Sequence, residues 1–459
     1  MFPALVREVL FPLHEAVLRR PTMACLSHLE GSQWLERAEF EKLQRALLTR
    51  LLRVARSHSP WHRGRLPSGL KSADEPIEWD QFRTFPTMTR ADARAHREQI
   101  VWKSVPGGVQ PYNTGGSSGQ PLTFYFGRRR QAADAASRMR ARRWWGIDVG
   151  SREVLLWGAP IELKRTDRIK TIRDRLFNQL LLNAFDMNAD SMERYIEAIQ
   201  AYRPAVLYGY ASSVALLCTY ARNRGRSLRV PSLRLVCTTG EPLYPDRRQQ
   251  IAKAFGVPVA SEFGSRDGGF IAHESPAGQM LQTADAVILE VLDSQGRPCP
   301  PGQPGEAVIT NLYSDAQPFI RYRTGDVVTL SPDRCAEGRA LPVLASVAGR
   351  TTDFVVRADG TVMHALSLIY VLRALPSINE FKIVQRAVDD LEVLVVAGPS
   401  WSERDAGQVV AGLQARLGHS ARIDIQRVDT IPPEASGKHR YVVSHVPLPA
   451  ETRFVKASD

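Results

Sequence analysis

A short run of glycines and hydroxyl residues between Asn113 and Pro121 is the stretch of this sequence best suited to bind an anion. The run contains Thr114, Gly115, Gly116, Ser117, Ser118 and Gly119. Glycines expose backbone N–H groups that can close around an oxyanion, and the hydroxyls add further donors. No Gly-Lys-Ser/Thr follows, so this is not a Walker A loop. By itself such a loop is more often a flexible turn, so its interpretation depends on the motifs that follow.

Two further stretches follow predicted strands. Gly240, Glu241 and Pro242 come after a strand that ends at Cys237. Ligands of α/β sheets bind at the carboxyl ends of strands, so this turn is placed to line a planar ring. The stretch after the next strand supplies an aromatic ring, a hydroxyl and a carboxylate, from Phe263, Gly264, Ser265 and Asp267.

Two later stretches carry one charged side chain each. Asp326 follows a glycine turn, where a carboxylate can accept two sugar hydroxyls. Lys438 follows Ser436 and Gly437 on a predicted mobile loop. Each feature alone also fits a purely structural role, because a Gly-Asp pair is usually only a turn and a lysine usually lies at the surface.

Strands and helices alternate in the middle of the chain. Predicted strands are 153–157, 205–208, 233–237 and 259–262, and predicted helices are 129–145, 191–202, 213–222 and 245–255. This alternation favours an α/β domain with largely parallel strands. From Ala286 onward, strands separated by Gly/Pro turns predict a β-rich subdomain.

The texture changes again after Gly349 and Arg350. Residues 353–429 predict strand, helix, two strands, helix and strand, a small α+β unit. We therefore predict a large N-terminal domain, residues 1–348, with a helical extension to about 105, and a mobile C-terminal lid domain, residues 349–459.

Composition limits the class of protein. No run of about eighteen apolar residues exists, so no transmembrane segment is predicted. The five cysteines form no Cys-x-x-Cys pair, which favours a reducing, cytoplasmic location. The net charge of +12 is spread along the chain without a nucleic-acid-binding motif, so no nucleic-acid partner is expected. Residues 2–20 predict a helix interrupted by Pro12, which either caps a domain or makes weak peripheral contact with a membrane.

Taken together and in order, these motifs resemble the adenylate-forming superfamily of acyl- and aryl-CoA ligases. The form of the glycine loop, Gly240-Glu241-Pro242, Phe263 to Asp267, Ile320 to Asp326 and Gly349-Arg350 are similar to phenylacetate–CoA ligase and to relatives in capsular-polysaccharide gene clusters. The resemblance covers about residues 30 to 445.

The resemblance implies a role for each motif. Thr114 to Gly119 would hold the ATP phosphates, and Gly240 to Pro242 with the stretch from Phe263 would contact adenine. Asp326 and Arg350 would bind the ribose. The two catalytic residues would be Asp267, which orients Mg²⁺, and Lys438, which bridges the substrate carboxylate and the α-phosphate. Tyr208, Gly209 and Tyr210 would line the acyl pocket, together with Trp157.

Three departures from the family pattern matter. Gln120 stands near the place of a phosphate-binding lysine in many members. Asp267 replaces a glutamate that is common in the branch and is one methylene shorter, so a contact with Mg²⁺ through water is an alternative to direct contact. Thr352 stands where most members carry an acidic hinge residue. The Cys/His cluster of some relatives also lacks its cysteines near His273, which predicts no zinc and a surface histidine.

The sequence therefore predicts a ligase that uses ATP and Mg²⁺ to adenylate a small carboxylic acid. The acyl group would then pass to a thiol, with coenzyme A as the expected acceptor. A carrier-protein thiol, or an amine or hydroxyl of a saccharide or peptide, is the alternative acceptor. A non-catalytic nucleotide-binding protein on the same fold is the rival from another class.

Overall fold

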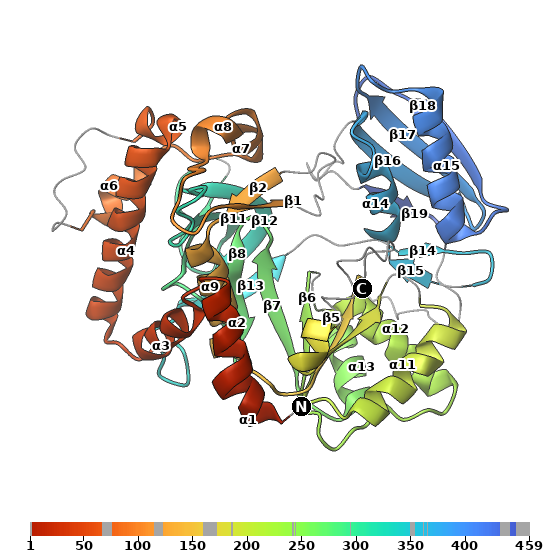
Figure 1. Ribbon diagram of the computed structural model, residues 1–459, viewed down its shortest axis with the longest axis horizontal. Helices are drawn as coiled ribbons and strands as arrows, with labels where there is room; N and C mark the ends of the chain where they lie inside the picture. Colours follow the sequence, from red (N-terminus) through yellow and green to blue (C-terminus); the bar gives the residue numbers. More distant parts are fainter. Residues whose placement is uncertain are drawn as a thin grey trace. The chain divides into compact units, whose positions relative to one another are not determined.

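The computed structural model describes residues 2–66, 76–113, 123–158, 172–184, 187–240, 243, 245–293, 295–348, 354–360, 362–364, 366–431 and 441–446 (Figure 1). The chain divides into two compact units. The first comprises the described residues of 1–114, 122–151 and 260–349. The second comprises those of 152–259 and 350–459.

Helices make up most of the beginning of the first unit. They are α1 (Pro3–Leu5), the π-helix η1 (Val6–Leu10), α2 (Phe11–Val17), α3 (Thr22–Ser32), α4 (Arg37–His58), α5 (Pro60–Arg63), α6 (Trp79–Arg83), α7 (Arg90–Ala95), α8 (Arg97–Ile100) and α9 (Arg128–Trp144). Thr89 and Asp92 form a capping box at the start of α7. The prediction that Pro12 interrupts the first helix is confirmed in part: residues 3–17 are all helical, but the π-helix η1 gives way to α2 one residue before Pro12. Pro12 lies in the first turn of α2, where the missing N–H costs little.

The first unit also contains an antiparallel set of strands. Their order is β10 (Val287–Leu292), β11 (Pro304–Asn311), β12 (Tyr322–Leu330), β13 (Val343–Ala348), β9 (Met280–Gln282), β8 (Gly269–Glu274) and β7 (Val259–Ser265). A separate hairpin pairs β1 (Gln110–Asn113) with β2 (Thr123–Phe126). β10 and β11 confirm the β-rich part predicted from Ala286 onward, whereas β8, β9, β12 and β13 were not predicted.

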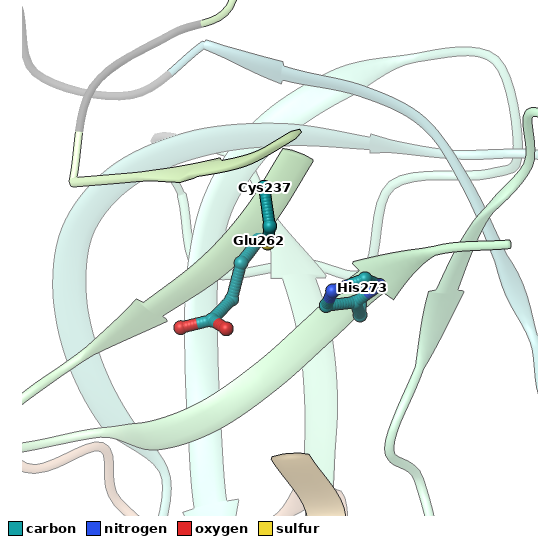
Figure 2. A group of neighbouring side chains, drawn as sticks. All are labelled: Cys237, Glu262 and His273. Carbon is teal, nitrogen blue, oxygen red and sulfur yellow. The ribbon is translucent and has the colours of Figure 1, made fainter. Parts of the chain in front are cut away.

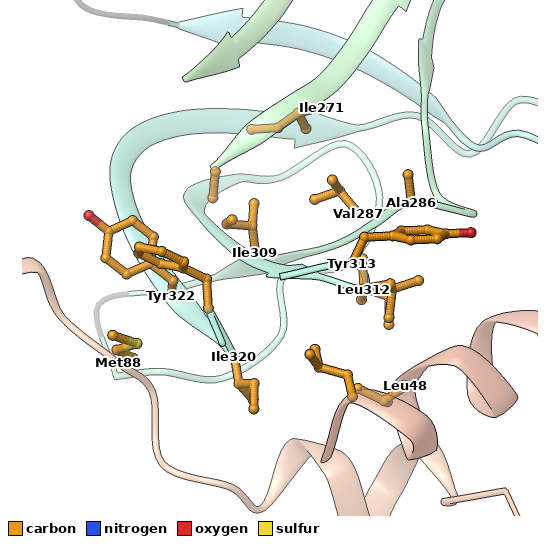
Figure 3. Packing of buried hydrophobic residues seen from close by; sticks show 14 of the residues in the cluster. Leu48, Met88, Ile271, Ala286, Val287, Ile309, Leu312, Tyr313, Ile320 and Tyr322 are labelled. Carbon is orange, nitrogen blue, oxygen red and sulfur yellow. The ribbon is translucent and has the colours of Figure 1, made fainter. Parts of the chain in front are cut away.

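The core of the first unit lies between α4 and this sheet (Figure 3). Leu48 of α4 is fully buried, as are Ile271 and Ile309 of the strands. Two tyrosines, Tyr313 and Tyr322, belong to the same cluster, and their hydroxyls point to opposite sides of it (Figure 3). The apolar stripe of α4 and the alternating strand residues thus bury one common face.

The second unit contains the predicted parallel strands. The order is β6 (Leu235–Thr239), β5 (Val206–Tyr210), β3 (Glu153–Trp157) and β4 (Gln179–Asn183), all parallel. Three helices, α11 (Ala189–Tyr202), α12 (Ala211–Asn223) and α13 (Pro245–Phe255), bury apolar residues with these strands. The α/β fold class is confirmed. Sequence patterning missed β4, whose Leu-Leu-Leu run is too short to distinguish a strand from a helix.

The C-terminal part of the second unit is a small α+β structure. Its elements are β14 (Phe354–Val356), β15 (Val362–His364), α14 (Leu366–Arg373), β16 (Ile378–Ala387), β17 (Asp390–Ala397), α15 (Glu403–Leu417), β18 (Arg422–Arg427) and β19 (Val442–Ser444). The sheet order is β18-β17-β16-β19, in which the central pair is antiparallel and both outer pairs are parallel. Among the described residues, no helix is long and apolar enough to cross a membrane.

Candidate active site

Asp267 lies in the tight turn between β7 and β8 of the first unit, and both of its carboxylate oxygens are hydrogen-bonded. The hydroxyl of Tyr322 donates to Oδ2 at 2.7 Å, and the N–H of Gly268 donates to Oδ1 at 3.2 Å. Asp267 is 8% exposed and Tyr322 is 1% exposed. The turn therefore holds a carboxylate in one fixed orientation, attached to β12 through Tyr322.

Arg130 of α9 fixes the backbone of the same turn. Its Nη2 donates to the carbonyl oxygens of Asp267 at 2.7 Å and Arg266 at 3.3 Å. The guanidinium also pairs with Asp134 at 3.4 Å and lies over the ring of Phe126 at 4.2 Å. Because α9 begins directly after β2, Arg130 connects the β1–β2 hairpin to the Asp267 turn.

The Asp267 carboxyl stays ionised in this setting. Burial raises its pKa, but Arg90 and the hydrogen bonds from Tyr322 and Ser265 outweigh burial, so the pKa lies below its usual range. An ionised carboxylate is the ligand type that Mg²⁺ prefers, and each oxygen has a lone pair beyond its present hydrogen bond. In charge and donor type, Asp267 fits the metal role that the sequence predicts.

Glycines make this turn as compact as it is. A Cβ on Gly264 would lie 2.6 Å from the carbonyl oxygen of Gly269. Gly269 itself has a φ of +102°, and its Cβ would lie 2.8 Å from Oδ1 of Asp134. A side chain at Gly264 would push β7 away from β8, and a side chain at Gly269 would push the turn away from α9.

The predicted adenine-contacting residues Phe263 and Ser265 lie within β7, not in the loop after it. Phe263 is 8% exposed and belongs to the core of the first unit. The Ser265 hydroxyl accepts a hydrogen bond from the N–H of Gly268 at 2.8 Å. The strand is longer than predicted because β8 pairs with it through Ser265, a long-range contact that local patterning does not reveal.

Asp326, the predicted ribose ligand, lies inside β12 at an irregularity of the strand. Gly325 has a φ of +77°, and the pairing with β11 shifts between Glu306 and Val308. The N–H of Asp326 donates to the Thr324 hydroxyl at 3.1 Å. The predicted tight turn is therefore a bulge, and bulges re-aim side chains from the regular pleat.

In the second unit the predicted acyl-pocket residues form an aromatic stack. The ring of Trp157 lies 4.2 Å from that of Tyr210 and 5.6 Å from that of Tyr208. Gly209 allows β3 and β5 to approach, since its Cβ would lie 2.7 Å from the carbonyl oxygen of Leu156. Gly240 lies against the Tyr210 ring, 3.2 Å from Cε1 to a Cβ added there. Within this unit, the predicted adenine turn and acyl pocket therefore meet at Tyr210.

His273 is buried, so the expectation of a surface histidine is wrong. It lies opposite Glu262 on the β7–β8 pair (Figure 2). Its Nδ1 lies 2.8 Å from the carbonyl oxygen of Glu274. Burial lowers the pKa of His273 to about 4, although Glu262 opposes this shift. At neutral pH the ring is uncharged.

Several predicted site residues lie outside the described part of the chain. These are Thr114, Gly115, Gly116, Ser117, Ser118, Gly119, Glu241, Pro242, Arg350 and Lys438. Their roles stay predictions. Sequence reasoning missed the support from Tyr322 and Arg130, since neither residue type nor spacing shows which carboxylate a distant hydroxyl or guanidinium contacts.

Two protein families match parts of the chain. The AMP-binding enzyme family matches residues 179–312, and the CapK C-terminal domain matches residues 355–445. Protein CapK of Staphylococcus aureus is 22% identical over 365 residues, which cover 79% of this chain and 80% of that protein. Phenylacetate-coenzyme A ligase of Thermus thermophilus is 30% identical over 228 residues, covering 48% of this chain and only 51% of the ligase.

A solved structure shows the same fold. 2-Hydroxyisobutyryl-CoA ligase, in complex with 2-HIB-AMP and CoA in the thioesterification state, matches with a TM-score of 0.60 and 21% identity. The match covers 90% of this chain and 91% of that one. The two family matches, the similar proteins and the similar solved structure all point to adenylate-forming enzymes. The chain is thus similar to the AMP-binding enzyme family, and its relatives include phenylacetate-coenzyme A ligases and Protein CapK.

Proposed function

We propose that this protein is an ATP-dependent ligase that adenylates a carboxylic acid and passes the acyl group to a thiol, that of coenzyme A. In the first step the substrate carboxylate attacks the α-phosphorus of ATP, an acyl–adenylate bond forms, and pyrophosphate leaves. In the second step the thiol attacks the acyl carbon, and AMP leaves. The proposal builds on the match to the AMP-binding enzyme family and on the similarity to a coenzyme A ligase.

One observation supports this proposal in addition to the matches with known families. The hydrogen bond from Tyr322 to Asp267 joins two of the predicted motifs, which lie 55 residues apart in the sequence. The Tyr322 motif continues to Asp326 four residues along β12. One strand would therefore fix both the proposed metal-binding carboxylate and the proposed ribose-binding carboxylate, which would hold ATP in one orientation.

Asp267 would hold Mg²⁺, directly or through water, and the bound ion would neutralise charge on the ATP phosphates. Thr114 to Gly119 would donate to the same phosphates through backbone N–H and hydroxyl groups. Gly240, Glu241 and Pro242 would contact adenine, and Asp326 with Arg350 would bind the ribose. These residues hold the nucleotide in place, which is the larger part of catalysis in phosphoryl-type transfers.

Lys438 would supply the positive charge between the substrate carboxylate and the α-phosphate. An ammonium on a flexible stem suits a residue that must be withdrawn between the two steps. We propose that residues 349–459 act as a lid domain that carries Lys438 to and from the site. The aromatic stack of Trp157, Tyr208 and Tyr210 supports an aromatic or medium-sized apolar acid as substrate.

Exchange of labelled pyrophosphate into ATP tests the adenylation step. A panel of aryl, fatty and amino acids would be offered with ATP and Mg²⁺, and exchange should appear with one class of acid. The proposal fails if no acid in the panel supports exchange while isothermal titration shows that ATP binds. That combination would favour a non-catalytic nucleotide-binding protein.

A second candidate keeps the adenylate but changes the acceptor. The C-terminal match at residues 355–445 is to the CapK C-terminal domain, and CapK matches this chain over more of its length than the phenylacetate ligase does. The alternative acceptors are a carrier-protein thiol, or an amine or hydroxyl of a saccharide or peptide. AMP release that is independent of coenzyme A, with exchange intact, would favour this candidate.

A further inference from the structure

The first helical segment of the chain carries a row of exposed apolar side chains. It runs from α1 through η1 into α2, residues 3–17. The row and the residue just before the segment have large exposed fractions: Phe2 82%, Leu5 42%, Val9 49%, Leu13 60% and Val17 73%. These five account for half of the ten exposed large apolar residues among the described residues. Such a concentration marks an interaction surface, whereas single exposed apolar residues do not.

The π-helical turn keeps this row on one side of the segment. Leu5, Val9, Leu13 and Val17 are spaced by four residues. In a regular α-helix of 3.6 residues per turn, a spacing of four drifts steadily around the axis. The wider turn of η1, Val6–Leu10, drifts in the opposite sense and offsets part of this rotation. The four side chains therefore form a narrow, nearly straight row.

Contacts on the other side of the segment fix which face is outward. Val6 is fully buried, and its Cβ would lie 2.9 Å from a Cβ added to Gly150. Glu15 is 2% exposed and accepts hydrogen bonds from Arg20, at 2.5 Å, and from Thr22. The segment is thus attached through Val6 and a buried carboxylate network. Its apolar row faces outward, which is the reverse of a helix that caps a core.

We propose that this row binds the interface of an anionic lipid bilayer, with the helix axis lying in the membrane plane. Arg7 and Arg19 belong to the same stretch of chain. The side chain of Arg7 is 41% exposed and pairs with Glu8 at 2.7 Å, and Arg19 is exposed. The net charge of +12 adds a general attraction to anionic headgroups. A helix with exposed apolar residues on one face and arginines in the same stretch has the composition of an interfacial helix. The proposal does not depend on the proposed ligase activity.

A second copy of the chain is the weaker occupant. A stable dimer buries about 800 Å² on each partner, and the row of four partly exposed side chains together with Phe2 offers on the order of a few hundred Å². A bilayer needs no matching shape, so a narrow row suffices to partition into it. These considerations favour lipid over a protein partner.

Vesicle co-sedimentation of the full chain tests the proposal. The vesicles would contain phosphatidylcholine with about 30 mol% phosphatidylglycerol, compared with phosphatidylcholine alone. The test variant carries Val9→Ser, Leu13→Ser and Val17→Ser. The matched control carries Ile172→Ser and Leu176→Ser, two apolar residues of comparable exposure, 60% and 41%, on another helix.

The wild type and the control should bind anionic vesicles equally. The affinity of the triple variant for these vesicles should be lower by about tenfold or more. Val17→Trp should strengthen binding, because tryptophan favours the headgroup region. Equal thermal unfolding of all variants would show that the fold is retained. Failure of the wild type to bind anionic vesicles overturns the proposal. So does a wild-type dimer in light scattering that the triple variant abolishes, since this would identify a second copy as the occupant.

Discussion

Tyr322 and Asp267 are joined by a hydrogen bond of 2.7 Å between two buried side chains. The phenol comes from β12 and the carboxylate from the β7–β8 turn, so the bond connects two parts of the first unit. Because the hydroxyl donates to the charged form, it helps to keep the pKa of Asp267 below its usual range. This contact makes the proposed metal carboxylate dependent on a residue that need not touch any ligand.

Tyr322→Phe should therefore weaken the use of Mg²⁺ without removing a metal ligand. We expect the Mg²⁺ concentration needed for half-maximal pyrophosphate exchange to rise roughly 10- to 100-fold, the usual cost of losing the group that orients a ligand. Paramagnetic resonance of Mn²⁺ with a non-hydrolysable ATP analogue measures the same loss as binding, without turnover.

Tyr313→Phe is the matched control for this change. Tyr313 is a buried tyrosine of the same cluster, but its hydroxyl points to the other side (Figure 3). It should leave the Mg²⁺ dependence unchanged. An equal loss in both variants would show that Tyr322 acts only through packing.

Asp267→Asn tests the carboxylate itself. The amide keeps the size of the side chain and can still accept from Tyr322, but it loses the charge that attracts Mg²⁺. We expect pyrophosphate exchange to fall roughly 100-fold or more. Exchange at the wild-type rate, measured at saturating Mg²⁺ and again at low Mg²⁺, would rule out a metal role for Asp267.

Lys438→Ala separates the two proposed half-reactions. Adenylation should fall by roughly 10²–10³-fold, because a charge that stabilises the transition state is lost. Transfer of the acyl group from a preformed acyl–adenylate to coenzyme A should stay close to the wild-type rate. Rapid-quench measurement of each step decides the matter, and equal losses in both would contradict the assigned role.

Gly150→Ala should destabilise the attachment of the first helical segment. Gly150 has a φ of +83°, and an added Cβ would lie 2.4 Å from the carbonyl oxygen of Pro3. We expect a loss of roughly 3 kcal/mol in the free energy of unfolding. Gly278→Ala is the control, with a similar φ of +78° and nothing within 4 Å, so it should cost only about 1 kcal/mol. Urea unfolding of both variants measures the difference, and equal losses would mean that the Pro3 contact is unimportant.

His62→Gln should reduce the dependence of the free energy of unfolding on pH in the acid range. Burial lowers the pKa of His62 to about 4, against a hydrogen bond to Pro318 that opposes the shift. Between this value and the unfolded pKa of about 6.5, the unfolded chain binds a proton that the folded chain does not, so stability falls as the pH falls. The contribution is on the order of 3 kcal/mol.

Urea unfolding at several pH values checks this prediction. Buried histidines make the free energy of unfolding fall as the pH is lowered from 6.5 to 4. The variant should lose about half of this pH dependence. The other half should persist, because His273 also has a pKa of about 4. An unchanged slope in His62→Gln would contradict the assignment.

Sequence patterning predicted much of the fold because local signals are strong where strands and helices alternate. The parallel strands β3, β5 and β6, the helix α9 and nearly all of the C-terminal α+β elements follow from apolar periodicity and turn residues. Patterning failed where pairing partners are distant. It placed Phe263 and Ser265 after a strand that contains them. It also missed β4, β8, β9, β12, β13, β15 and β19.

The sequence by itself determined the family-like motifs and their order, because residue type and spacing are written in the chain. It named Asp267 and Asp326 but said nothing of what holds them. Only the tertiary structure decided that Tyr322 and Arg130 support the Asp267 turn, that His273 is buried, and that the apolar row from Leu5 to Val17 faces outward. Burial and long-range hydrogen bonds depend on which distant segments pack against each other, and local sequence does not determine that packing.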